Sequence, residues 1–84
     1  MTRDEIAEFN EELLMLEPSY FDKAIVGIVS NVACEAVCYD VSKIIKILMK
    51  EDKMTEEEAR EYYDFNIHGS FVGPHTPVYL EKSL

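Results

Sequence analysis

The sequence contains no tryptophan and only two cysteines, three glycines and three prolines among its 84 residues. This scarcity of glycine and proline leaves no low-complexity linker, and the length is typical of one domain, which we predict to span residues 1–84. So few cysteines exclude the disulfide framework of a small secreted domain. The longest apolar stretch, residues 24–30, is far too short to cross a membrane, so we expect no membrane association.

Basic residues are also scarce, because eight Lys and Arg stand against 17 Asp and Glu, for a net charge of −9. Such a charge repels nucleic-acid phosphates and anionic membranes and attracts basic surfaces. We therefore expect no direct binding of nucleic acid, and a basic protein as partner. Residues 1–10 are polar and lack the apolar core of a secretory signal, so we expect a cytoplasmic location.

Residues 1–17 predict an acidic, amphipathic N-terminal helix, running over residues 2–16. Thr2 and Glu5 have the spacing of a capping box, and Pro18 ends the helix because the residue before a proline avoids the helical region. Apolar side chains recur at helical spacing along one face. They are Ile6, Phe9, Leu13, Leu14 and Leu16.

Residues 20–80 predict a mixed core of helices and strands. Two short apolar runs, residues 24–29 and 35–39, predict a β-hairpin with its turn at residues 30–34. A buried helix over residues 24–38 is the alternative, since periodicity cannot separate the two for short runs. The β-branched composition of the first run favours the strand.

Two more helices and a last strand follow the hairpin. Asp40 is a good N-cap for a helix over residues 41–51, and Thr55 with Glu58 predicts a capping box for the next helix. Residues 76–80 predict an edge strand with proline near its start. The order αββααβ indicates an α+β fold of three helices on a two- or three-stranded antiparallel sheet. The residues expected to face the core on the third helix are Ala59, Tyr62, Tyr63, Asn66, Ile67 and Ser70.

Several strings in residues 21–80 resemble one group of sequences. They are the FDKAIVG run at residues 21–27, YD at 39–40, MTEEEA at 54–59, YDFN at 63–66 and TPV at 76–78. The group comprises small proteins of bacteriophages and bacterial mobile elements without an assigned chemistry. The resemblance implies a phage setting, so the partner would belong to a bacterial host. The acidic N-terminal helix and the apolar, cysteine-containing hairpin turn depart from the usual pattern.

The residues that bear chemistry form no familiar catalytic or metal pattern. Cys34, Cys38, His68 and His75 are the candidates for zinc ligands or for a Cys–His nucleophile pair, but the two histidines lie outside zinc-finger spacing. No phosphate-binding or dinucleotide motif is present. We predict neither enzyme activity nor a cofactor, and we interpret the cysteines as small apolar core residues. A buried Asn66 would need hydrogen-bond partners, and we expect it to hold the loop of residues 68–77.

Two acidic stripes and one apolar seam are the candidate interaction sites. On the helices, neighbouring acids of a stripe lie about 5–6 Å apart and can compete for a phosphate-binding groove. The stripes are Glu5, Glu8 and Glu12 on the first helix, and Glu57, Glu61 and Asp64 on the third. The seam has the 3-4-3 spacing of a helix pair and predicts either packing on the chain's own sheet or a homodimer. Its residues are Ile6, Phe9, Leu13 and Leu16.

The leading hypothesis is an inhibitor of a host nucleic-acid-binding defence protein, such as a CRISPR effector, that acts by steric and electrostatic occlusion. One alternative is a structural or regulatory homodimer with no anti-defence role, in which the acids only confer solubility. Another is a small enzyme or nucleotide sensor that uses the loop of residues 68–77.

Overall fold

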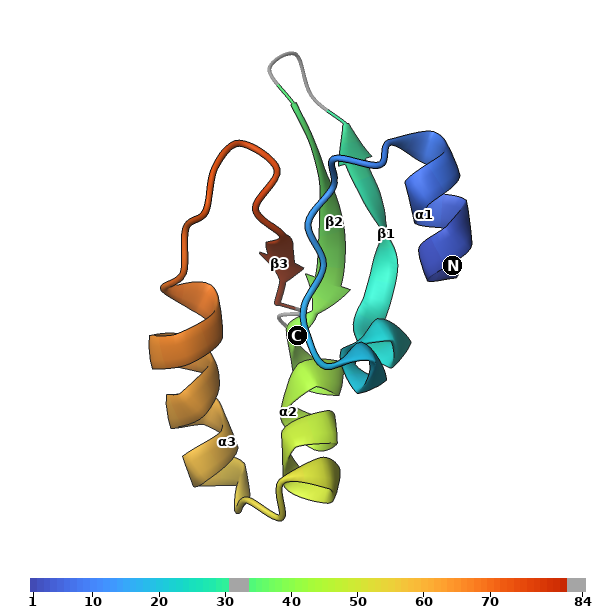
Figure 1. Cartoon of the computed structure of the whole chain (residues 1–84). Coiled ribbons are helices and arrows are strands. Elements are labelled where there is room, and N and C mark those ends of the chain that lie inside the picture. The colour runs from blue at the N-terminus through green and yellow to red at the C-terminus, as the bar shows by residue number, and fades with distance from the viewer. Residues whose placement is uncertain (31–33, 82–84) are drawn as a thin grey trace.

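The structure is a computed structural model that describes residues 1–30 and 34–81. Helices and a three-stranded sheet form one small α+β domain (Figure 1), which confirms the predicted fold class and the order αββααβ. A short 3-10 helix, η1, precedes the first strand, and a π-helix, η2, extends the third helix. The elements are α1 (Arg3–Phe9), η1 (Ser19–Ala24), β1 (Ile25–Ser30), β2 (Glu35–Asp40), α2 (Val41–Glu51), α3 (Glu56–Tyr62), η2 (Tyr63–His68) and β3 (Val78–Leu80).

The sheet has β2 in the middle, with β1 antiparallel on one side and β3 parallel on the other. The prediction of a wholly antiparallel sheet is therefore wrong. A parallel neighbour needs a crossover connection, and α2 and α3 supply it by carrying the chain away from the sheet and back. The hairpin itself is confirmed, although most of its predicted turn, residues 31–33, lies outside the described residues.

The helix starts are where the capping residues predict them. Asp40 accepts a hydrogen bond from the Lys43 amide at 3.3 Å, and α2 covers the predicted residues. At α3 the Thr55 hydroxyl accepts from the Glu58 amide at 3.2 Å, and the Glu58 carboxylate accepts from the Thr55 amide at 2.9 Å. These contacts satisfy amides that have no partner inside the helix.

Helix α1 ends at Phe9, so the prediction of a helix to residue 16 is wrong. Asn10 ends it, because its side-chain oxygen accepts a hydrogen bond from the Glu12 amide at 2.9 Å, an alternative to the helical ladder. The Asn10 amide group also donates to the Glu35 carboxylate at 3.0 Å. Residues 11 and 12 then form a turn, after which the chain continues in extended form across the near side of the sheet (Figure 1).

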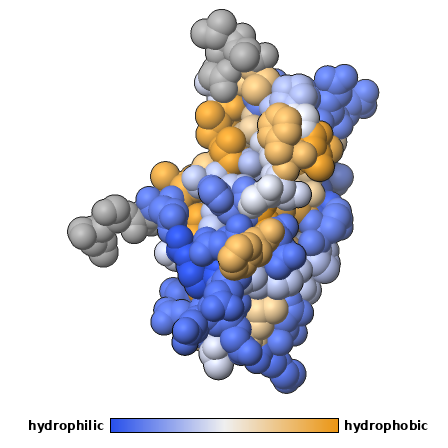
Figure 2. Space-filling view, turned by 90° about the vertical axis from the view of Figure 1, so that its left-hand side faces the viewer, coloured by the Kyte–Doolittle hydropathy of each residue, from blue (hydrophilic) through white to orange (hydrophobic). Residues whose placement is uncertain are grey.

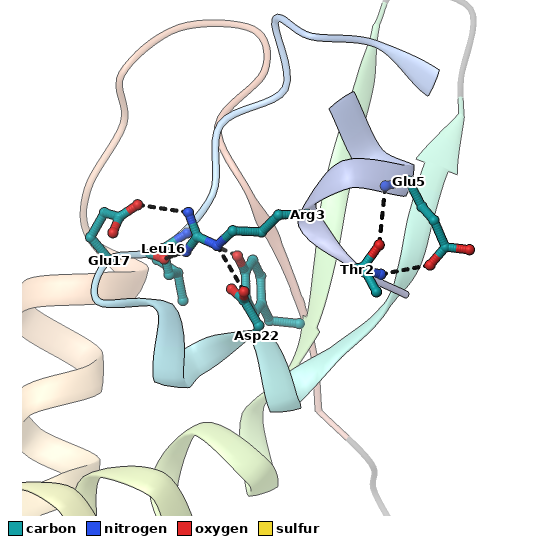
Figure 3. Close-up of polar contacts among 7 residues, drawn as sticks. Thr2, Arg3, Glu5, Leu16, Glu17 and Asp22 are labelled. Carbon is teal, nitrogen blue, oxygen red and sulfur yellow. Dashed lines mark hydrogen bonds and ion pairs between the residues drawn. The ribbon is translucent and has the colours of Figure 1, made fainter. Parts of the chain in front are cut away.

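Arg3 holds this extended segment against η1 (Figure 3). Its guanidinium donates to the Asp22 carboxylate at 2.7 Å, to the Glu17 carboxylate at 2.8 Å and to the Leu16 carbonyl at 2.9 Å. The Leu16 amide in turn donates to the buried Tyr39 hydroxyl at 2.8 Å. The segment after Asn10 is thereby tied at two points, to η1 through Arg3 and to the central strand through Tyr39.

The core lies on one face of the sheet and takes side chains from every helix. It includes Ile6 of α1, Phe21 of η1, Leu48 of α2 and Ala59 of α3, packed with Tyr39 of β2. No helix within residues 1–30 and 34–81 is long and apolar enough to span a bilayer.

The π-helical segment η2 changes which side chains of the third helix are buried. A π-helix has more residues per turn than an α-helix, so side chains rotate away from the positions that an α-helix gives them. Tyr63 and Ile67 point into the core as predicted, whereas Asn66 and Ser70 are exposed and Tyr62 is 40% exposed. The predicted buried amide at Asn66 is therefore wrong.

Candidate protein-interaction surface

The outer side of α3 carries carboxylates that pair with no basic residue among residues 1–30 and 34–81. Glu57 and Glu61 are exposed, lie one helical turn apart and form no ion pair with any residue that the structure describes. The third member of the predicted stripe differs, because Arg60 lies 3.6 Å from the Asp64 carboxylate. Two of the three predicted acids of this stripe therefore form no ion pair within the described part of the chain and are accessible to an external partner.

Arg60 is the only basic residue of α3, and contacts within the chain already occupy it. Its guanidinium lies 2.7 Å from the Glu81 carboxylate, and this hydrogen bond raises the pKa of Arg60. The same contact lowers the pKa of Glu81. The positive charge is thus directed toward the C-terminal end of β3, and the outer side of α3 stays acidic.

Phe65 lies next to these acids and is 81% exposed. Together with Tyr62 it lines a shallow hollow, which Glu58 and Glu61 also line. An exposed aromatic ring inside a polar rim has the composition of an interaction hot spot. Sequence analysis missed Phe65, although its position four residues after Glu61 places it on the same helical edge.

Figure 2 looks onto the side of the molecule that carries α3 and the loop after η2. The lower part, over α2 and α3, is mainly hydrophilic with an isolated hydrophobic spot, and the upper part carries larger hydrophobic areas. In that loop Phe71 is 79% and Val72 is 65% exposed. The loop is held to β2, because the Nδ1 atom of His75 lies 2.7 Å from the Glu35 carbonyl oxygen.

The predicted stripe on the first helix is not assembled. Glu5 closes the capping box with the Thr2 amide at 2.7 Å, and this hydrogen bond lowers its pKa. Glu12 lies beyond the end of α1, and its carboxylate is 3.7 Å from Nε2 of His75. Of the three acids of this stripe, only Glu8 remains exposed without such a contact among the described residues. Since α1 and α3 lie at opposite sides of the domain (Figure 1), the two sets of acids do not share one surface.

The predicted seam for a homodimer is divided between core and surface. Ile6 and Leu13 are buried within the monomer, Leu16 is half-buried, and Phe9 is 54% exposed. Because α1 ends at Phe9, the four residues do not lie on one helix. A homodimer through these residues stays a prediction, for which Phe9 is the side chain best placed to contribute.

The Cys38 thiol and the hollow formed by the loop of residues 68–77 give no support to the enzyme alternative. Burial raises the pKa of the Cys38 thiol, and the Asp40 carboxylate adds to the effect, the opposite of what activates a thiolate nucleophile. No three His, Cys, Asp or Glu side chains gather as metal ligands in the part of the chain that the structure describes. The hollow beside Phe71, about 440 Å³ in volume, is wide open to solvent and lined mainly by the loop itself.

Comparison of the chain with family models, curated proteins and solved structures finds no match. The resemblance to small phage proteins therefore stays a prediction.

Proposed function

We propose that this protein binds a basic, nucleic-acid-binding protein through the outer side of α3 and blocks its nucleic-acid site. The observation that carries the proposal is the row formed by Glu57, Glu61 and Phe65. Its two carboxylates are unpaired among the described residues, and its aromatic ring is 81% exposed. The carboxylates supply attraction for lysine and arginine, and the ring supplies apolar contact area.

The charge of the whole chain supports the same class of partner. With a net charge of −9, the protein is attracted from a distance to a positive groove, and the attraction speeds encounter. A partner built to bind phosphates presents such a groove, and carboxylates held on a rigid helix can occupy it. Occupation excludes nucleic acid both by charge and by volume.

The setting follows from the resemblance to phage proteins. Under this proposal the partner is a host defence protein that binds nucleic acid, for example a CRISPR effector, and the encounter takes place in the bacterial cytoplasm. The alternative, a structural or regulatory homodimer, predicts self-association and no such partner.

The test begins with affinity capture from a bacterial lysate at low and high salt, followed by purification of any nucleic-acid-binding protein that is retained. The wild-type chain should displace labelled nucleic acid from that protein. The variant E57K/E61K should lose displacement at least tenfold, because two attractions become repulsions at the contact. Salt should weaken wild-type binding, since the Debye length is about 8 Å at physiological ionic strength.

A charge-matched control separates the face from the total charge. Glu8 and Glu11 are exposed on or just after α1 and form no ion pair among the described residues, so E8K/E11K changes the net charge equally. The proposal predicts that this control keeps most of the inhibition. Equal loss in both variants would mean that only total charge matters, and full activity of E57K/E61K would exclude the α3 face.

A further inference from the structure

A shallow hollow lies where α3 passes into η2, and two aromatic side chains line it. Phe65 is 81% exposed and Tyr62 is 40% exposed. Met54, which is half-buried and packed against the core cluster, lines the same hollow. The hollow is about 360 Å³ in volume and combines this aromatic surface with exposed polar groups. Its polar lining consists of Glu58, Glu61 and Asn66.

The π-helical segment η2 supplies one side of the hollow. Single π-helical turns inside α-helices are rare and occur frequently at functional sites. In a continuous α-helix Asn66 would face the core, whereas in η2 it is exposed and lines the hollow. Phe65, the preceding residue, lies outside the core cluster. Both side chains are therefore available to a partner, and neither is used in the packing of the core.

The described part of the chain places no cation of its own in this hollow. Among residues 1–30 and 34–81, the carboxylates of Glu58 and Glu61 form no ion pair. One oxygen of Glu58 accepts a hydrogen bond from the Thr55 amide at 2.9 Å, and the second oxygen is not part of this cap. The hollow therefore offers aromatic rings and negative charge to a cation from outside the chain.

Arg60 shows how an arginine side chain is held on the neighbouring side of the same helix. Its guanidinium carbon lies 5.5 Å from the centroid of the Tyr63 ring. Its nitrogen atoms lie 2.7 Å from the Glu81 carboxylate and 3.6 Å from the Asp64 carboxylate. One aromatic ring and two carboxylates thus surround this guanidinium. The hollow presents groups of the same two kinds, two aromatic rings and two carboxylates, without an arginine between them.

We propose that the hollow receives an arginine side chain of the basic partner. The inference rests on the proposed function, because it names the residue type by which that partner is held. A guanidinium stacks on aromatic rings and bonds a carboxylate through two nitrogens at once. Phe65 supplies the stacking surface, Glu61 supplies the carboxylate, and the side-chain oxygen of Asn66 can accept a further hydrogen bond.

The chemistry of the two basic side chains favours arginine over lysine in this hollow. The lysine ammonium is a compact, strongly hydrated charge that does not stack, whereas the planar guanidinium is weakly hydrated and lies flat on a ring. Proteins that bind phosphate groups use arginine widely, because its two parallel nitrogens match the phosphate oxygens. A nucleic-acid site therefore presents the side chain that the hollow is suited to bind.

The experiment titrates the free chain with a blocked tripeptide that carries one arginine between two glycines, followed by amide NMR shifts. At physiological ionic strength, the shifts of Glu61, Tyr62 and Phe65 should saturate at roughly millimolar peptide, since one side chain forms only a weak contact. The same peptide with lysine should bind at least about threefold more weakly. The peptide with citrulline, which has the shape of arginine without its charge, should cause no saturable shift.

Two variants and one matched control assign the contact to the hollow. Phe65→Leu keeps an apolar side chain but removes the ring, and Glu61→Gln keeps the size but removes the charge. Each should weaken binding of the arginine peptide at least about threefold. Glu57→Gln removes the same charge one helical turn away and outside the hollow, so it should bind the arginine peptide like the wild type.

Three outcomes on the wild-type chain would overturn the inference, whether or not the variants fold. They are the absence of shifts at the hollow, binding of the citrulline peptide as tight as that of the arginine peptide, and equal binding of lysine and arginine. Unchanged arginine binding in a folded Phe65→Leu variant would also overturn it.

The peptide titration needs no partner protein, so it can fail separately from the displacement of nucleic acid. Arginine binding in the hollow without displacement by the wild-type chain would overturn the proposed blocking and uphold the hollow. Displacement that is lost in E57K/E61K but unchanged in Phe65→Leu would uphold the proposed function and overturn the arginine contact.

Discussion

Arg3→Ala should destabilise the fold by about 2 kcal/mol, most of it from two contacts. Hydrogen bonds to charged groups contribute about 1.5–3 kcal/mol. The contacts with Asp22, at 2.7 Å, and with the Leu16 carbonyl, at 2.9 Å, are partly buried. The contact with Glu17 is weaker support, because that carboxylate is 72% exposed and exposed pairs contribute about 0–1 kcal/mol.

Removal of the Arg3 side chain also leaves the Asp22 carboxylate without its cationic partner, and this adds to the expected loss of stability. The other Asp22 oxygen, Oδ1, is buried and has no hydrogen-bond partner among the residues that the structure describes, so Asp22 depends on Arg3 for the neutralisation of its charge. The extended segment after Asn10 also loses one of its two ties. For a domain of this size, about 2 kcal/mol corresponds to a fall in Tm of roughly 8–16 °C.

Thermal and urea unfolding of Arg3→Ala and Arg60→Ala measure the difference. Arg60 is the matched control, because it also bonds two carboxylates but is 45% exposed, so its removal should cost about 0–1 kcal/mol. Equal losses in the two variants, or a fall in Tm below about 2 °C for Arg3→Ala, would refute the reasoning from burial.

Two further predictions concern the buried Tyr63 and Tyr79 and the cap of α3. Burial, assisted by the Glu81 carboxylate, raises the pKa of Tyr63 to about 12, and burial raises the pKa of Tyr79 to about 12. The unfolded value is about 10, so this stabilisation is complete below pH 10 and is lost as the pH rises toward 12. Tyrosinate absorbance followed together with circular dichroism should show late titration that coincides with unfolding, and complete titration in an intact fold near pH 10 would contradict it. Thr55→Ala should cost about 1 kcal/mol in urea unfolding by removing the cap of α3, whereas Thr55→Ser should cost little. Equal stability of the alanine and serine variants would show that the cap contributes nothing.

Local signals predict much of the fold. The capping residues Asp40 and Thr55 identify where α2 and α3 begin, because a cap depends only on residues within one turn. The helix predicted over residues 2–16 fails at Asn10, whose side chain competes for the backbone. The direction of β3 relative to β2 could not be predicted either, because it depends on how α2 and α3 pack and on which end of the sheet the chain reaches after them.

The candidate surfaces, like the fold, can be predicted from the sequence only in part. The exposure of Glu57 and Glu61 follows from helical spacing alone, and the structure bears it out. The predicted burial of Asn66 is wrong because no local sequence pattern indicates the π-helix. The face of the sheet that the helices cover cannot be identified from sequence, since strands that are apolar on both sides do not show which side the helices pack on.

The parallel pairing of β3 with β2 also constrains the order of folding. The β1–β2 hairpin and the α2–α3 pair join neighbours in sequence, whereas pairing of Val78 with Cys38 must close a loop that contains both helices. We expect contacts of such long range to form late in folding, because the entropy of closing the loop opposes them. The ring of Tyr79, which packs edge-on against Tyr63 at 5.5 Å, should therefore reach its place after the helices have formed. Changes at this strand should act mainly on the rate of unfolding.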